Sequence, residues 1–286
     1  MSQVTDGAGG RSLKKSVIYG LILGFGFLFS IVFVKELFIA LAAVAAAAGS
    51  AELSKAMRIK GWYVARPALI VGSVILMPIT YYFGSFGQWM GTFSLVLLLI
   101  VWRLAHLLTD KSSRTSFAKV ILDFSAATFI VIYVPLTTSF TMLMLADPAG
   151  QGYKWIITYV VTVIFTDSFG YLIGRRLGKT KIAPGVSPKK SLEGLIASIV
   201  FGGSAAIGLT IFLIGGTWYQ GAILGAVVIF AAVFGDLAES LIKRDLGVKD
   251  MSSVLPGHGG VMDRLDSIIP ATLVTYLFWQ LSAVLF

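Results

Sequence analysis

Residues 219–243 read YQGAILGAVVIFAAVFGDLAESLIK, an almost unbroken apolar run that ends in a lysine. A helix that crosses a bilayer needs about 20 mainly apolar residues, because each residue advances it by about 1.5 Å through a hydrocarbon core of about 30 Å. The run is therefore long enough to cross. It also contains Asp236 and Glu239, and acids inside a membrane span mark a functional or a paired structural role.

The composition extends this interpretation to the whole chain. Of 286 residues, 57% are hydrophobic and 13% are charged, against about 25% charged in an ordinary soluble domain. The absence of cysteine excludes disulfides, thiolate catalysis and cysteine-ligated zinc. Recurring apolar blocks predict an all-α integral membrane protein with about nine transmembrane helices. The predicted spans are 17–34, 36–54, 67–84, 88–108, 118–146, 154–174, 192–214, 219–243 and 266–285.

Two of these spans have unusual features. Only Lys35 and Glu36 separate the first span from the second, which predicts a very tight hairpin. The fifth span is long and contains Pro135, which predicts a kinked or tilted helix.

The basic residues indicate how the helices are oriented. With a cytoplasmic N-terminus, all of the 23 lysines and arginines except Lys35 and Lys154 fall in cytoplasmic segments. Positive charge gathers on the inner side of membrane proteins, so the N-terminus is predicted inside and the C-terminus outside. We expect a cytoplasmic tail at 1–16, N-terminal transmembrane helices at 17–150 and a C-terminal transmembrane catalytic region at 151–286.

Four aspartates from three spans lie near predicted cytoplasmic helix ends. Asp167 belongs to the sixth span and Asp236 to the eighth, and Asp263 and Asp266 stand three residues apart at the start of the ninth. Oxygen-only ligands of this kind suit Mg²⁺, which is a hard cation. The alternative is that each acid forms an ion pair with a nearby cation: Lys243, Arg244 or Arg264.

A basic loop precedes the seventh span. Ser187-Pro188 predicts a helix start there, with serine as the N-cap and proline in the first turn. A helix N-terminus beside lysines can bind phosphate. The alternative is a topology determinant that attracts anionic lipid. The loop has six cations: Arg175, Arg176, Lys179, Lys181, Lys189 and Lys190.

A glycine-rich turn, PGHGG at 256–260, stands immediately before Asp263 and Arg264. Its glycines would let backbone N–H groups surround phosphate oxygens. A turn of this kind is weak evidence when it stands alone, but here an Asp-Arg-x-Asp cluster follows it. The candidate residues of this turn are His258, Gly259 and Gly260.

The same region resembles a known family. The chain reads SLIKR at 240–244, KD at 249–250 and LPGHGGVMDRLD at 255–266, which resembles the signature of phosphatidate cytidylyltransferases at every fixed position over 27 residues. Further matches are TD at 166–167, GR at 174–175, SPKKS at 187–191 and EG at 193–194. Leu192 departs from the aromatic residue expected there, which is a packing or lipid-facing change. The resemblance covers about 154–270, and residues 1–150 contribute no site residue to it.

The resemblance implies the reaction CTP + phosphatidic acid → CDP-diacylglycerol + pyrophosphate. Two anions must meet and pyrophosphate must leave, so cations have to neutralise charge. We expect Asp263, Asp236 and Asp167 to bind Mg²⁺ and Asp266 to be a ligand or to contact one. The resemblance would allow K⁺ or Mg²⁺ as a second cation.

The expected phosphate-binding residues divide into two sets. Those for the CTP phosphates are Arg175, Lys179, Lys189 and Lys190, with Ser187 beside them and Ser191 as a hydroxyl donor. Those for the lipid phosphate or the leaving pyrophosphate are Lys243, Arg244 and Arg264. His258 is a site residue without an assigned role, because phosphatidate is already anionic and needs no strong base. His106, on an apolar span, is expected to be structural.

The expected partners are CTP, phosphatidic acid and membrane lipids, with a homodimer suggested by analogy and no nucleic acid. The expected location is the cell (inner) membrane, with several crossings and the active site facing the cytoplasm. One alternative is a CTP-dependent kinase of a membrane alcohol such as a polyprenol, which should lack the complete 240–266 signature. Another is a cation transporter, which should show mid-bilayer acids and an internal repeat. CDP-alcohol phosphotransferases are set aside because their aspartate spacing is absent.

Overall fold

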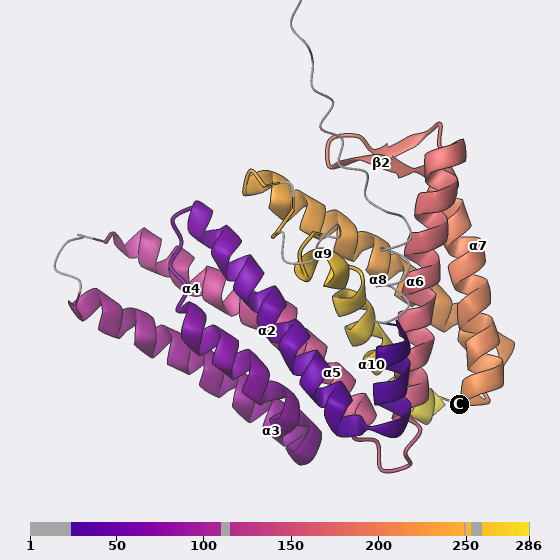
Figure 1. Ribbon diagram of the computed structural model, residues 1–286, viewed down its shortest axis with the longest axis horizontal. Coiled ribbons are helices and arrows are strands. Elements are labelled where there is room, and N and C mark those ends of the chain that lie inside the picture. The colour runs from indigo at the N-terminus through magenta and orange to yellow at the C-terminus, as the bar shows by residue number, and fades with distance from the viewer. Residues whose placement is uncertain (1–23, 110–114, 249, 253–258, 286) are drawn as a thin grey trace, which may run out of the picture.

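The computed structural model describes residues 24–109, 115–248, 250–252 and 259–285 (Figure 1). Almost all of the regular structure is helical, as the apolar runs predict. The helices are Gly24–Phe33, α2 Lys35–Ile59, α3 Arg66–Thr109, α4 Phe117–Val131, η1 Ile132–Leu136, α5 Thr137–Leu145, α6 Gly152–Leu177, α7 Leu192–Leu209, η2 Thr210–Ile214, α8 Trp218–Asp245, α9 Met262–Leu265 and α10 Ile268–Leu285. The two strands are β1 Lys181–Ala183 and β2 Ser187–Ser191.

Six of the described helical segments are long and apolar enough to cross a membrane. This confirms a multi-pass, all-α membrane protein, whereas the count of nine crossings and the orientation of the termini stay predictions. The six segments are Lys35–Ile59, Arg66–Thr109, Phe117–Leu145, Gly152–Leu177, Leu192–Ile214 and Trp218–Asp245.

Helix α3 contains two arms, in the region where two spans were predicted. Gly84 breaks the helix with φ 61° and ψ −147°, a backbone conformation that is open mainly to glycine. The arms then pack against each other, since a methyl group added at Gly72 would collide with the side chain of Leu95. The 44-residue segment is therefore folded back on itself rather than extended.

The interruption expected at Pro135 takes the form of a π-helical turn, η1, between α4 and α5. Proline has no N–H, and its ring clashes with the carbonyl of the residue four positions earlier. The regular i→i−4 hydrogen-bond pattern therefore cannot continue through it. The Thr137 hydroxyl donates to the carbonyl of Ile132 at 2.8 Å, within the same irregular turn. The first expected break is present too, because the backbone leaves the helical conformation at Val34.

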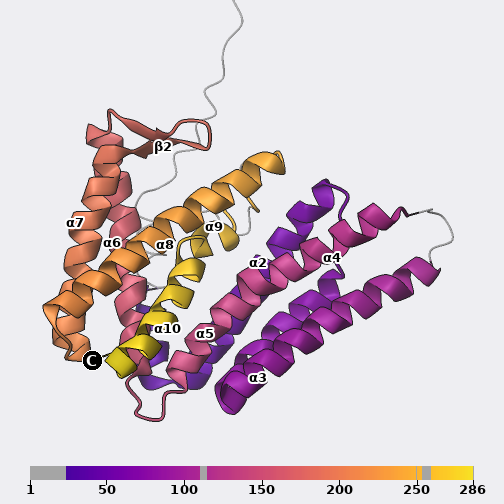
Figure 2. The same cartoon turned by 180° about the vertical axis from the view of Figure 1, so that it is seen from behind.

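The helices form two flanks with α8, α9 and α10 between them. Figures 1 and 2 show α3 and α4 along one flank and α6 and α7 along the other. The α6–α7 pair is tightly packed through small residues. A methyl group added at Gly194, for example, would lie 2.7 Å from the carbonyl oxygen of Gly170. This close packing fixes the position of the β1–β2 hairpin, which connects the two helices.

One apolar cluster joins the N-terminal helices to the C-terminal region. It contains Leu53 of α2, Leu69 of α3 and Ile130 of α4, packed with Met262 of α9 and Ile269 of α10. All five side chains are at most 2% exposed. The start of α10, with the aspartates beside it, therefore rests on the N-terminal half.

The predicted helix start at Ser187-Pro188 is wrong. Ser187 to Ser191 form strand β2, which pairs antiparallel with β1. Helix α7 begins at Leu192 instead, with Ser191 as its N-cap, and the Ser191 hydroxyl accepts the N–H of Gly194 at 3.3 Å. Proline is tolerated on an edge strand, and a serine three residues before a glycine N–H makes an equally good cap, so the local sequence allowed both positions.

Candidate active site

A cavity of about 1050 Å³ opens between α6, the β hairpin, α8 and the start of α10. It is polar on several sides because each of these elements contributes charged or hydroxyl side chains. Most of the residues predicted from the sequence line it: Asp167, Arg175, Ser187, Lys189, Lys190, Ser191, Asp236, Lys243, Asp263, Arg264 and Asp266. Segments separated by about a hundred residues in the chain thus meet at one site.

The remaining predicted residues lie elsewhere. Lys179 is exposed and does not line the cavity. Arg244 donates through Nε to the carbonyl of Val186, so its guanidinium joins the end of α8 to the turn of the β hairpin. Gly259 and Gly260 lie beside Asp263 rather than on the cavity wall. His258 falls outside the described residues.

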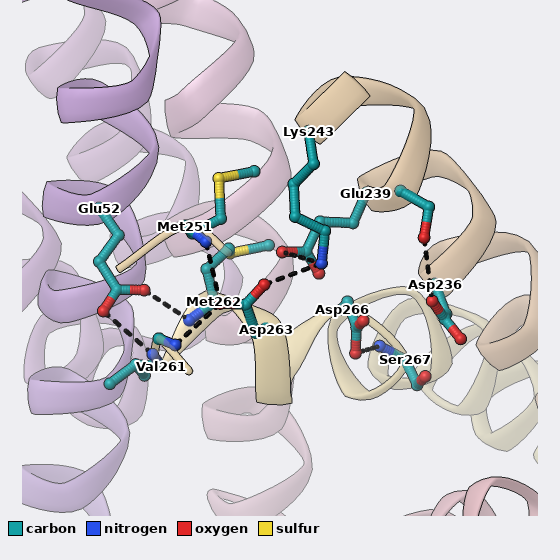
Figure 3. A network of polar contacts seen from close by, with 12 residues as sticks. Glu52, Asp236, Glu239, Lys243, Met251, Val261, Met262, Asp263, Asp266 and Ser267 are labelled. Carbon is teal, nitrogen blue, oxygen red and sulfur yellow. Dashed lines mark hydrogen bonds and ion pairs between the residues drawn. The ribbon is translucent and has the colours of Figure 1, made fainter. Parts of the chain in front are cut away.

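Asp263 is held on both carboxylate oxygens (Figure 3). Oδ1 accepts from Lys243 Nζ at 2.8 Å, and Oδ2 accepts the N–H groups of Gly260 at 2.8 Å and Met251 at 3.0 Å. Burial alone would raise the pKa of this carboxyl, but the Lys243 ammonium and the two backbone N–H groups together hold it below its ordinary value. Asp263 is therefore a fixed negative charge that binds Lys243 and the backbone N–H groups of Met251 and Gly260.

Lys243 links Asp263 to a second acid on its own helix. Its Nζ lies 3.5 Å from Glu239 Oε1 across one helical turn. Glu239 is completely buried, and neither of its carboxylate oxygens has a hydrogen-bond partner among the residues that the structure describes. Lys243 is only 16% exposed in its side chain, so Lys243, Asp263 and Glu239 form a compact, poorly solvated group of ionisable side chains.

Lys190 and Asp236 meet across the cavity. Lys190 Nζ lies 3.0 Å from Asp236 Oδ2 and donates to the carbonyl of Val233 at 3.1 Å. Asp236 Oδ1 also accepts from the hydroxyl of Ser240 at 3.4 Å. A lysine predicted to bind CTP phosphates thus pairs with an acid predicted to bind a metal. The ion-pair alternative is realised for Asp263, whose partner is Lys243. Asp236 also forms an ion pair, but with Lys190, which was not among the expected partners.

The aspartates supply the right donor type for Mg²⁺ without forming a finished cluster. Asp167, Asp236, Asp263 and Asp266 all line the one cavity, and carboxylate oxygens are the ligands that this cation prefers. Within the described ranges, however, no three acidic, histidine or cysteine side chains are gathered closely enough to hold a metal ion. The predicted ligand set therefore stays a prediction.

The N-terminal half contains buried charges that the sequence interpretation missed. Glu52 of α2 reaches the start of α9, where it accepts two backbone N–H groups. Asp123 of α4 forms a buried ion pair with Arg103 of α3, with 2.6 Å between Oδ2 and Nη2. Both acids stand in apolar spans, and that exception to the apolar pattern was the available signal.

His106 belongs to the same buried polar group. Its ring lies 4.5 Å from that of Tyr63, and its Nδ1 lies 3.2 Å from Arg103 Nη1. A smaller cavity of about 360 Å³ adjoins this group. Its lining includes His106, Tyr63 and Arg103, together with Arg58 and Lys119.

The comparisons with known proteins give one consistent result. Residues 14–282 match the model of the cytidylyltransferase family, so the likeness begins well upstream of the expected 154. The chain is 35% identical over 274 residues to a phosphatidate cytidylyltransferase of Mycobacterium bovis, covering 94% of this chain and 88% of that protein. The identity to the Mycobacterium leprae protein of that name is 34% over 274 residues, covering 93% and 87%. For the chloroplastic phosphatidate cytidylyltransferase 4 of Arabidopsis thaliana it is 32% over 311 residues, covering 96% and 75%. The chain therefore belongs to the cytidylyltransferase family.

Proposed function

We propose that this protein is an integral membrane phosphatidate cytidylyltransferase that converts CTP and phosphatidic acid into CDP-diacylglycerol and pyrophosphate. The family membership and relatives of that name, aligned over more than nine-tenths of the chain, support the assignment. The observation that carries it is the cavity of about 1050 Å³, where a basic hairpin faces the acids and cations of the 240–266 signature.

The arrangement of cations suits a reaction between two anions. Lys189, Lys190 and Arg175 lie on the hairpin side and would bind the CTP phosphates. Lys243 and Arg264 lie on the other side and would bind the lipid phosphate or the leaving pyrophosphate. Cations fixed in a partly buried cavity stabilise the charge that develops in the transition state without having to reorganise.

The Lys190–Asp236 ion pair supports a role for the hairpin in binding the nucleotide. The pair is partly exposed to the cavity, at 22% and 34% of the two side chains, so an entering phosphate can contact Lys190. The phosphate would replace Asp236 as the partner of the ammonium and leave that carboxylate available.

Mg²⁺ is proposed as the cofactor, held by Asp236, Asp167, Asp263 and Asp266, with K⁺ or a second Mg²⁺ as a further cation. When bound, Mg²⁺ neutralises negative charge on the phosphate oxygens. Asp263 would in addition keep Lys243 and the backbone at Gly260 in place through the contacts described above.

The membrane setting follows from the two substrates. The acyl chains of phosphatidic acid stay in the bilayer while CTP arrives from water, so the cavity must be reached from both. We place the protein in the cell (inner) membrane with the cavity on the cytoplasmic side, as the distribution of basic residues indicates. A homodimer is proposed from the glycine-rich helices, since small residues allow close helix packing.

The test is the conversion of CTP and phosphatidic acid by purified protein in lipid, with and without Mg²⁺. We expect Mg²⁺-dependent CDP-diacylglycerol from the wild type and at least a 100-fold lower rate from Asp263→Asn, because an oriented charged group is lost. The matched control is Asp245→Asn, whose exposed carboxyl lies outside the cavity and pairs with Lys60. Folded wild-type protein that makes no product from several phosphatidates would overturn the assignment, and a polyprenol would then be the acceptor to test.

A further inference from the structure

Glu52 is a buried acid far from the signature in sequence. It lies in α2, within a span rich in alanine, and it is 6% exposed. An acid in such a position carries a large desolvation cost unless its oxygens are occupied by donors. Its surroundings therefore have to account for its presence.

The donors to Glu52 that the structure describes come from the C-terminal third (Figure 3). Oε1 accepts the N–H of Val261 at 3.0 Å and the hydroxyl of Ser252 at 2.5 Å. Oε2 accepts the N–H of Met262 at 2.8 Å. The three groups are neutral, so the carboxylate is stabilised by hydrogen bonds that converge on it from one short segment.

That segment is also the one that orders Asp263. Glu52 holds the two backbone N–H groups of Val261 and Met262, and the N–H of the preceding Gly260 points to Asp263 Oδ2 at 2.8 Å. The two acids therefore bind successive N–H groups of one turn, Glu52 from the side of α2 and Asp263 from the cavity side. A shift of the turn away from Glu52 would move Asp263 and, through it, Lys243.

The packing at Gly260 confirms how closely the two halves meet. A methyl group added to Gly260 would collide with the Glu52 carboxylate, whose atoms are its three nearest neighbours. Gly260 has an ordinary negative φ, so a larger side chain is excluded there by Glu52 rather than by the backbone conformation.

We propose that Glu52 is a positioning residue of the active site, through which helix α2 fixes the backbone of residues 260–262 and so the placement of Asp263 and Lys243. The proposal rests on the cytidylyltransferase activity proposed above. It assigns a catalytic consequence to the N-terminal half, whose described helices contribute no residue to the cavity wall. Glu52 itself touches no substrate.

The first test compares Glu52→Gln with Glu36→Gln, the same change near the start of the same helix. The glutamine keeps its size but turns an NH₂ group toward a backbone N–H. We expect kcat to fall at least 10-fold, because small displacements of reacting groups cost about 10- to 100-fold, while the KM for CTP changes less than about 3-fold. Glu36→Gln should leave both constants unchanged, since Glu36 is exposed at the other end of α2.

Amide hydrogen exchange, measured in the same samples, distinguishes the positioning role of Glu52 from a purely structural role. Positioning predicts faster exchange at Gly260, Val261 and Met262 in Glu52→Gln, with the α6–α7 peptides unchanged and an unchanged folded fraction. Uniformly faster exchange, or a lower kcat explained entirely by unfolded protein, would overturn the proposal. The exchange result does not depend on activity, so it tests this proposal separately from the proposed function. Failure of the proposed function would show instead as inactive wild-type protein.

A double-variant cycle gives an independent test. Gly260→Ala should lower kcat at least 10-fold in the wild type because the methyl group displaces the turn. In the Glu52→Ala background the obstructing carboxylate is gone, so the further loss from Gly260→Ala should be under about 3-fold. Equal losses in the two backgrounds would refute the contact on which the proposal depends.

Discussion

Replacing Asp123 with asparagine should destabilise the protein strongly although the residue lies outside the active site. Asp123 Oδ2 lies 2.6 Å from Arg103 Nη2, and the two side chains are 0% and 7% exposed. Its Oδ1 accepts the N–H of Tyr63 at 2.7 Å, and the Tyr63 ring lies 4.5 Å from the Arg103 guanidinium carbon. Asparagine would keep an oxygen to accept the N–H of Tyr63, but it would leave the charge of Arg103 buried without a counter-ion.

The magnitude follows from that burial. Removing one partner of a buried ion pair costs about 3–5 kcal/mol, because the remaining charge stays desolvated. The exposed pair between Lys60 and Asp245, at 37% and 68% exposure, offers a matched comparison. Asp245→Asn should change the free energy of unfolding by no more than about 1 kcal/mol.

The assay is reversible unfolding in mixed micelles of rising denaturing detergent, followed by tryptophan fluorescence. A double variant, Asp123→Leu with Arg103→Met, removes both charges and should recover most of the loss, since apolar replacement of a buried pair is often close to neutral. If Asp123→Asn costs less than about 1 kcal/mol, or if the double variant is less stable than the single one, burial of the Arg103 charge does not govern the stability of this region.

Two further predictions concern the cavity. Lys190→Ala should raise the KM for CTP about 10- to 100-fold in steady-state assays, because a charge-assisted hydrogen bond is worth about 1.5–3 kcal/mol, and an unchanged KM would contradict its place in the nucleotide site. Gly235→Ala should lower activity at least 10-fold, since its methyl group would collide with the Asp266 carbonyl and lie 2.7 Å from Pro270 Cγ, displacing the start of α10. Gly203→Ala in α7 is the control, because a methyl group there meets nothing within 4 Å, and it should keep full activity.

Local signals predicted much of the helical structure and many of the residues that line the cavity. Membrane thickness fixes the length of an apolar run, so spans such as 219–243 are visible in the sequence alone. The signature residues Asp263 and Lys243 were identified for a similar reason, since the pattern that reveals them lies within a few turns of chain. The two arms of α3 correspond to the predicted spans 67–84 and 88–108, and the helix breaks at Gly84, the last residue of the first span.

Features that depend on distant partners were not predictable in this way. The β hairpin was missed because the Ser187-Pro188 dipeptide is also typical of a helix start. The strand is favoured only through pairing with a partner, as between Lys181 and Ser191, and the local sequence does not reveal that pairing. The Lys190–Asp236 pair joins two elements whose relative position only the fold determines. Glu52 was visible as an acid among alanines, but nothing local indicates which residues it contacts.

The distance along the chain between Glu52 and its donors has a consequence for biosynthesis. Ser252, Val261 and Met262 follow it by 200, 209 and 210 positions. At about 5–20 residues per second, the ribosome needs roughly 10–40 s to deliver them after Glu52 has been made. During that interval α2 contains an acid without its final donors, and burying such a group costs several kcal/mol. We therefore expect helix α2 to reach its final place only when the last part of the chain arrives. A truncated product ending before residue 252 would then present an unmatched acid to the membrane's quality-control proteases.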